Sequence, residues 1–332
     1  MTTGRSKSID VLKAVAALLI INSHLEALHL RPWMAADGLL GNTIFFFTTG
    51  FTLASSLRRN PSQTLTKFLW NRFSRLYPAV WLVMILLPPL PFSWTSWDAW
   101  RIVMVYPTQF TFVRTIIPLY PVFYFLIRSN PGSLKLGIIA LVSMAAGCVM
   151  AWWRVVAMVQ PGVAWSELGS GAWFPHFGGA MLLGAYVALR PNGKNAEHAP
   201  LRTVIHCLLG CCVYLTLRIM ALSSLSDGLG HLVQSLAVLS MPVTAFVILT
   251  VMQLFESPAS LRLQSVSALA AIITFLSAHT WETYLLHVGI ARLPFVSSAP
   301  YPLALIFVFA LTLVLAPLLR RISTLPFKKA RR

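Results

Sequence analysis

Residues 8–26 read SIDVLKAVAALLIINSHLE, and this stretch decides the fold. Its centre is apolar without a break from Ala14 to Ile21, whereas both of its ends carry polar and ionisable side chains. A helix that crosses a lipid bilayer needs about 20 mostly apolar residues. The stretch therefore predicts a membrane-spanning helix that retains Asp10, Lys13 and His24 within or beside the bilayer.

The rest of the chain repeats this pattern. It is 57% hydrophobic and 11% charged, whereas soluble domains carry about 25% charged residues. We expect an all-α fold: a polytopic membrane bundle of about ten transmembrane helices, forming a single integral-membrane domain over residues 1–332. Pro107, Pro118 and Pro121 interrupt the fourth helix and predict a broken or re-entrant segment there. The expected helices lie at 9–29, 39–57, 76–92, 102–127, 134–153, 173–189, 202–222, 232–254, 267–290 and 301–319.

The net charge of +17 is explained by topology. Lysine and arginine collect in the cytoplasmic segments of polytopic proteins. With the N-terminus inside, twenty of these residues fall in inside segments and four in outside segments. We therefore expect both termini to be cytoplasmic, the lipid bilayer to be the main partner, and no binding to nucleic acid. The four outside residues are Arg31, Arg101, Arg154 and Arg292.

The polar residues of the first helix share one face. At about 100° per residue, the steps from Lys13 to His24 total about 1100°, or three turns plus about 20°. On the same count Asp10 lies about 40° from His24, and Lys13 about 16 Å from it along the axis. Ionisable groups within a span usually face the bundle interior or a wet cavity. This favours a functional role for His24, whereas Asp10 and Lys13 could instead extend to the membrane interface.

A basic segment over 58–77 is expected to form a cytoplasmic loop that contains Arg72 and Arg75. Spaced by three, these two arginines share a face if the segment is helical. Two guanidinium groups on one face suit the recognition of phosphate. The alternative is an ordinary basic loop that contacts lipid headgroups. The preceding segment FFFTTGF, at 45–51, combines small and bulky residues in a way that is typical of close helix packing.

The ninth helix carries His279, Thr283 and His287 at intervals of four, with Glu282 between them. For His287 a functional role and a packing role are equally open, and His279 is more typical of packing. These residues do not form the H-E-x-x-H pattern of a zinc site, so no metal is expected. The four cysteines all lie in apolar stretches, where free cysteine behaves as a small hydrophobic residue.

Several of these motifs resemble one known family. The Lys13-x10-His24 spacing is similar to the Arg/Lys-x10-His signature of the acyltransferase-3 family of integral-membrane acyltransferases. The segment at 46–51, FFTTGF, and Arg72-x-x-Arg75-Leu76-Tyr77-Pro78 resemble two further elements, and the segments at 177–181 and 283–287 resemble weaker later ones. The chain departs from the family over 119–124, where the family's acidic residue is missing.

The resemblance implies a polysaccharide O-acetyltransferase type of enzyme, multi-pass in the inner (plasma) membrane. It would move an acyl group, usually acetyl, from cytoplasmic acyl-CoA to a hydroxyl of a glycan, such as an exopolysaccharide, or of a lipid-linked sugar. Attack by an alcohol on a thioester needs a base whose pKa is near neutrality, and histidine is the usual one.

On this interpretation His24, Lys13 and Asp10 form the catalytic stripe, and His24 either acts as the base or is itself acylated. Arg72, Arg75 and Lys13 would bind acetyl-CoA or another acyl-CoA as donor substrate, and we expect no tightly bound cofactor. His287 and Tyr77 are weaker candidates for binding the acceptor.

Two other classes of function share the polytopic form. A transporter or flippase for a lipid-linked sugar would also have a polar interior, but such folds often contain repeated halves with matched broken helices. The proline-rich segment at 107–121 has no counterpart elsewhere in the chain. A non-catalytic membrane scaffold would leave the alignment of His24 with two charged residues unexplained.

Overall fold

The computed structural model describes residues 7–35, 38–87, 101, 110–129, 132–157, 170–190, 200–223, 238–256 and 267–328. Within these residues the regular structure is entirely helical, which confirms the all-α fold class. Besides α13 (Pro294–Ser297) and the 3-10 turns η1 (Glu26–Leu28) and η2 (Pro32–Ala35), the described residues form ten long helices. These are α1 (Lys7–Ser23), α2 (Gly38–Arg59), α3 (Leu65–Leu86), α5 (Thr111–Arg128), α6 (Ser133–Ala157), α7 (Ser170–Leu189), α8 (Pro200–Ser223), α10 (Ser240–Glu256), α12 (Ser267–Ala291) and α14 (Leu303–Lys328).

Several of these helices can cross a bilayer. By length and composition alone, four of the described helices qualify as spans, and they belong to α6, α7, α8 and α14. Helix α10 is apolar but shorter. The membrane bundle is therefore confirmed as a class, while the expected number of about ten spans stays a prediction.

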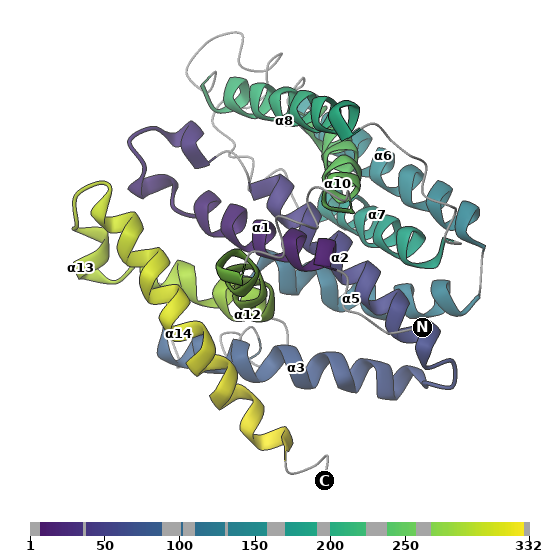
Figure 1. The fold of residues 1–332 in the computed structure, drawn as a ribbon, viewed down its shortest axis with the longest axis horizontal. Helices are drawn as coiled ribbons and strands as arrows, with labels where there is room; N and C mark the ends of the chain where they lie inside the picture. Colours follow the sequence, from purple (N-terminus) through teal and green to yellow (C-terminus); the bar gives the residue numbers. More distant parts are fainter. Residues whose placement is uncertain are drawn as a thin grey trace.

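Helix α1 occupies the centre of the bundle, packed between α2 and α12 (Figure 1). Helix α7 packs on α2 and α6 on α7, α8 pairs with α10, and α14 packs on α12. In Figure 1, η1, η2 and α13 lie at the left, whereas α1 begins near the middle of the view and α14 runs away from α13 to end at the lower middle. This arrangement agrees with two termini on one side, and the assignment of that side to the cytoplasm stays a prediction.

Glycines bring α2 and α7 into close contact. A Cβ atom on Gly50 would lie 1.8 Å from the backbone oxygen of Met181, and one on Gly184 would lie 2.0 Å from that of Phe47. No larger residue fits either position without separating the two helices. The packing interpretation of the segment at 45–51 is thereby confirmed. On the same helix, the Phe45 ring packs against α5, with its centroid 4.3 Å from that of Phe112.

Helix α1 ends at Ser23, earlier than expected, so the prediction of one helix over 9–29 was wrong at its C-terminal end. After Ser23 the backbone tightens, because the His24 N–H donates to the carbonyl of Ile21. The Asn22 side chain donates to the Met34 carbonyl at 2.8 Å and accepts from His29 at 3.0 Å. His24 therefore lies in the turn that follows α1, and it is exposed.

Helix α3 begins at Leu65, eleven residues earlier than the expected start at 76. Thr64 caps it by accepting a hydrogen bond from the backbone N–H of Lys67. Most of the segment expected to be a basic loop is thus helical, and Arg72 and Arg75 lie within α3. The rest of the predicted third helix, 88–92, lies outside the described residues.

Helix α5 is continuous from Thr111 to Arg128 and contains both Pro118 and Pro121, so the expected break at these prolines is not observed. The earlier part of that prediction, 102–109, lies outside the described residues. The end of α5 also supports the turn before α3. Arg128 donates to the carbonyls of Pro61 and Gln63, and the Tyr124 hydroxyl donates to Gln63 at 2.7 Å.

Candidate functional site

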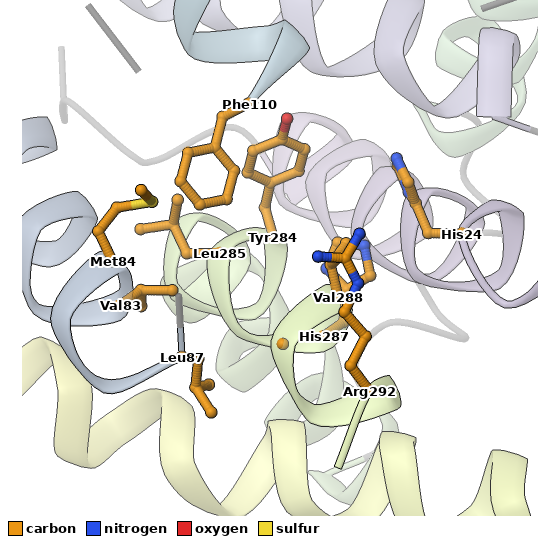
Figure 2. A pocket seen from close by; sticks show the side chains of 11 residues that line it. His24, Val83, Met84, Leu87, Phe110, Tyr284, Leu285, His287, Val288 and Arg292 are labelled. Carbon is orange, nitrogen blue, oxygen red and sulfur yellow. The ribbon is translucent and has the colours of Figure 1, made fainter. Parts of the chain in front are cut away.

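A cavity of about 190 Å³ lies where the ends of α1, α3 and α12 meet the start of α5 (Figure 2). Its polar side chains come from the turn after α1, from the last two turns of α12 and from the residue that follows α12, and its remaining wall is mostly aliphatic and aromatic. Pockets of this composition, with few polar groups in an apolar lining, are typical of substrate sites. The lining residues are His24, Val83, Met84, Leu87, Phe110, Tyr284, Leu285, His287, Val288, Gly289 and Arg292.

The structure brings His24 and His287 together in this cavity. Their ring centroids are 4.9 Å apart and the rings are inclined at 62°, an edge-to-face contact. His287 is fully buried, whereas His24 is exposed. Sequence reasoning named both residues but did not predict their contact, because it depends on how α1 packs against α12.

Hydrogen bonds fix the orientation of both rings. His24 Nδ1 lies 2.8 Å from the Ile20 carbonyl oxygen, and His287 Nδ1 lies 3.1 Å from that of Thr283. Since a carbonyl oxygen only accepts, each Nδ1 carries the proton and each Nε2 carries the lone pair. His287 Nε2 is buried and has no hydrogen-bond partner among the described residues. The cavity thus holds two imidazoles whose Nε2 atoms make no hydrogen bond with the residues that the structure describes.

Asp10 and Lys13 lie at the other end of the α1 stripe. Asp10 is buried and accepts a 2.8 Å hydrogen bond from Ser277 on α12, so it does not extend to the membrane interface. The stripe therefore contacts α12 at both ends, through Asp10 and through His24. Lys13 is half-buried and precedes His24 by about 16 Å along the helix. Neither Asp10 nor Lys13 lines the cavity, so the three predicted catalytic residues do not form one cluster.

Arg72 and Arg75 lie on α3 beside α5. The Arg72 guanidinium lies over the Phe68 ring, 5.7 Å from its centroid, and both arginines interact electrostatically with the buried Tyr120. Arg75 precedes the cavity residue Val83 by eight positions, or about 12 Å of helix. The two cations are therefore displaced from the cavity toward the side where α1 begins.

Tyr77 takes part in an aromatic row along α3. Its ring lies 5.7 Å from that of Phe73 and 5.5 Å from that of Trp81. Tyr77 does not line the cavity. Of the two residues that were the weaker candidates for binding the acceptor, only His287 lines the cavity.

Glu282 is a charged residue whose partners could not be predicted from the sequence. It is buried on α12, and its carboxylate interacts electrostatically with Arg320 of α14 and Arg75 of α3. Arg320 in turn donates to the Ala278 carbonyl of α12. A carboxylate in an apolar helix needs compensating cations. The sequence could therefore have predicted arginines opposite Glu282, but not which ones. Glu282 places a carboxyl group near Arg75, although the segment at 119–124 contains no acidic residue.

The sequence model of the acyltransferase-3 family, described as an acyltransferase domain, matches residues 6–321. The chain therefore belongs to this family of membrane acyltransferases, and the resemblance inferred from its motifs is confirmed.

A more specific likeness is to the peptidoglycan O-acetyltransferase OatA of Listeria monocytogenes, with 34% identity over 84 residues. The matched region covers 24% of this chain and spans only 13% of that relative. No solved structure matches the chain.

Proposed function

We propose that this chain is a membrane O-acyltransferase of the inner (plasma) membrane. It moves an acyl group, acetyl in the simplest case, from cytoplasmic acyl-CoA to a hydroxyl of a glycan or lipid-linked sugar. The observation that carries the proposal is the pair of His24 and His287 in one cavity, where Nδ1 of the exposed His24 is hydrogen-bonded and its Nε2 has no partner among the described residues. Membership of the acyltransferase-3 family and the partial likeness to an O-acetyltransferase support it.

In the proposed reaction, His24 Nε2 takes the proton of the acceptor hydroxyl as the hydroxyl oxygen attacks the thioester carbonyl. The new C–O bond forms, the C–S bond breaks, and the leaving thiolate takes the proton back from the His24 imidazolium. The Ile20 carbonyl keeps Nδ1 protonated throughout, so that Nε2 is the nitrogen that exchanges the proton. A route in which His24 Nε2 is acylated first uses the same atom as a nucleophile.

The donor would approach from the side of Arg72 and Arg75. These cations lie about 12 Å or more before the cavity along α3, and Lys13 lies about 16 Å before His24 along α1. An extended thioester arm can cover such a distance while its phosphates remain beside the arginines. Guanidinium forks bind phosphate in a bidentate manner, which makes Arg72 and Arg75 the better phosphate ligands and Lys13 an additional charge.

Labelled acetyl-CoA supplied to inverted membrane vesicles tests the proposed function. We expect the label to appear in the glycan or lipid-linked sugar of vesicles that contain this protein, and not in vesicles that lack it. Movement of unmodified sugar across the membrane without incorporation of label would instead identify a transporter or flippase, and would overturn the proposal.

Arg72→Ala and Arg75→Ala should each raise the KM for acyl-CoA while the protein accumulates normally, because Arg320 still faces Glu282 when Arg75 is removed. Loss of a charge-assisted hydrogen bond costs about 1.5–3 kcal/mol, which corresponds to about a 10- to 100-fold change in KM. Lysine at either position should restore only part of the affinity, since it replaces a fork with a point charge.

Arg58→Ala is the matched control for this measurement, because Arg58 is an exposed arginine at the end of α2 that precedes the same turn. If neither Arg72→Ala nor Arg75→Ala alters the KM beyond what Arg58→Ala does, these arginines contact lipid headgroups and the donor site lies elsewhere.

A further inference from the structure

We propose that Arg292 binds an anionic group of the acceptor, so that the preferred acceptor is an acidic saccharide. The anion would be a carboxylate or phosphate carried on, or next to, the sugar that is acylated. This inference rests on the proposed function, because it specifies the acceptor class of the same cavity.

Arg292 directly follows α12 and lines the cavity together with His24 and His287. It follows Val288 by four residues, and Figure 2 shows its side chain directed back along α12 toward Val288 and His287. Within the described part of the chain, no hydrogen bond or ion pair engages its guanidinium, and no acidic side chain lines the cavity. An exposed guanidinium therefore lines the cavity, and no described side chain neutralises its charge.

The predicted topology makes this charge unusual. Arg292 is one of only four lysines and arginines in the predicted external segments, so the general excess of cations on the cytoplasmic side does not account for it. An arginine that binds lipid headgroups would extend outward from the bundle. The Arg292 side chain instead runs along the cavity wall, on the side where His24 also projects (Figure 2).

The rest of the lining fits a sugar that carries such a charge. Phe110 and Tyr284 contribute aromatic rings with centroids 6.2 Å apart, and Met84 and Leu87 add aliphatic surface. Apolar walls with few polar groups fix the orientation of a ligand through those polar groups. The Arg292 guanidinium would bind the carboxylate or phosphate of the acceptor, and a hydroxyl of the neighbouring sugar would then lie beside His24.

The test compares matched acceptors in vesicles that contain the full-length protein and labelled acetyl-CoA. One acceptor is an oligosaccharide with a uronic acid, the second is its carboxyl-reduced neutral counterpart, and the third is a sugar linked to a lipid pyrophosphate. We expect the wild type to prefer an anionic acceptor, measured as a ratio of kcat/KM to the neutral acceptor of about tenfold or more. Arg292→Gln should bring that ratio close to one, and Arg292→Lys should give an intermediate ratio.

Arg31→Gln is the control, because Arg31 is another exposed arginine of a predicted external segment but does not line the cavity. This variant should keep the wild-type ratio. Loss of preference for the uronic acid identifies a carboxylate as the recognised anion, and loss of preference for the lipid-linked sugar identifies a phosphate; either result supports the proposal.

Two results would overturn the inference while leaving the proposed function intact. The first is an unchanged ratio in Arg292→Gln. The second is an equal loss of kcat/KM with all three acceptors, which would assign Arg292 to the reaction itself and not to recognition of an anion. A wild-type protein that acylates none of the acceptors, nor any endogenous glycan, would instead remove the proposed function and this inference together.

Discussion

His24→Ala should abolish acyl transfer while the protein accumulates normally in the membrane. Loss of a general base typically lowers the rate about 10²- to 10⁴-fold, and the loss should be larger if His24 also carries the acyl group. Normal accumulation is expected because His24 is exposed and follows α1, so that its removal opens no buried cavity. The measurement is acyl content of the acceptor, normalised to the amount of protein in the membrane.

Two further variants sharpen this prediction. His24→Gln can still form hydrogen bonds but offers no basic nitrogen, and it should be as inactive as His24→Ala. His206→Ala removes a histidine of α8 that does not line the cavity, and it should keep its activity. Near-normal acylation by a well-expressed His24→Ala protein would contradict the assignment of the base, and the proposed mechanism would fail with it.

His287→Phe should have the second largest effect, a loss of about 10²-fold in kcat. Phenylalanine keeps the volume of the buried ring but removes Nε2, which has no hydrogen-bond partner in the described part of the chain. The stability cost should be small, because Nε2 leaves no described partner unsatisfied and the Thr283 carbonyl, which loses Nδ1, still accepts a backbone N–H within α12. The effect is therefore expected on turnover and not on the amount of protein.

The double variant shows whether the two histidines act as a unit. When two residues act together in a reaction, the rate losses of the single variants do not add up in the double variant. His24→Ala with His287→Phe should therefore be no less active than His24→Ala alone. His279→Phe is the matched control, since His279 also bonds a carbonyl four residues earlier on α12 but does not line the cavity. Activity of His287→Phe within about threefold of wild type would return His287 to a packing role.

The positions of the helices were largely predictable, and their ends were not. The apolar run of α1 predicts a helix, but its end at Ser23 depends on contacts of Asn22 with Met34 and His29, which no local pattern reveals. The start of α3 was different, because Thr64 is a recognisable N-cap residue before an apolar segment. The high density of basic residues nevertheless favoured a loop at that point.

The candidate site was predictable in its parts but not as an assembly. Helical periodicity predicted that Asp10 and His24 share one face, and both contact α12 although His24 lies in the turn after α1. The partners on α12, Ser277 and His287, follow more than 260 residues later in the chain, and their identity depends on tertiary packing. The same holds for Glu282 of α12 and the two arginines near it, Arg320 of α14 and Arg75 of α3.

The early end of α1 has a consequence for the chemistry. Because the His24 N–H bonds to Ile21, the Ile20 carbonyl receives no backbone donor from it, and the Ser23 hydroxyl and His24 Nδ1 both donate to this carbonyl instead. The imidazole thus caps the C-terminus of α1, where helices leave carbonyl groups unsatisfied. The His24 ring is therefore already ordered in the folded protein, and substrate binding does not have to lose conformational entropy to orient it. The contacts that end α1 are thus the contacts that orient the proposed base. A substitution that extended α1 by another turn would remove the hydrogen bond that holds the His24 ring in place.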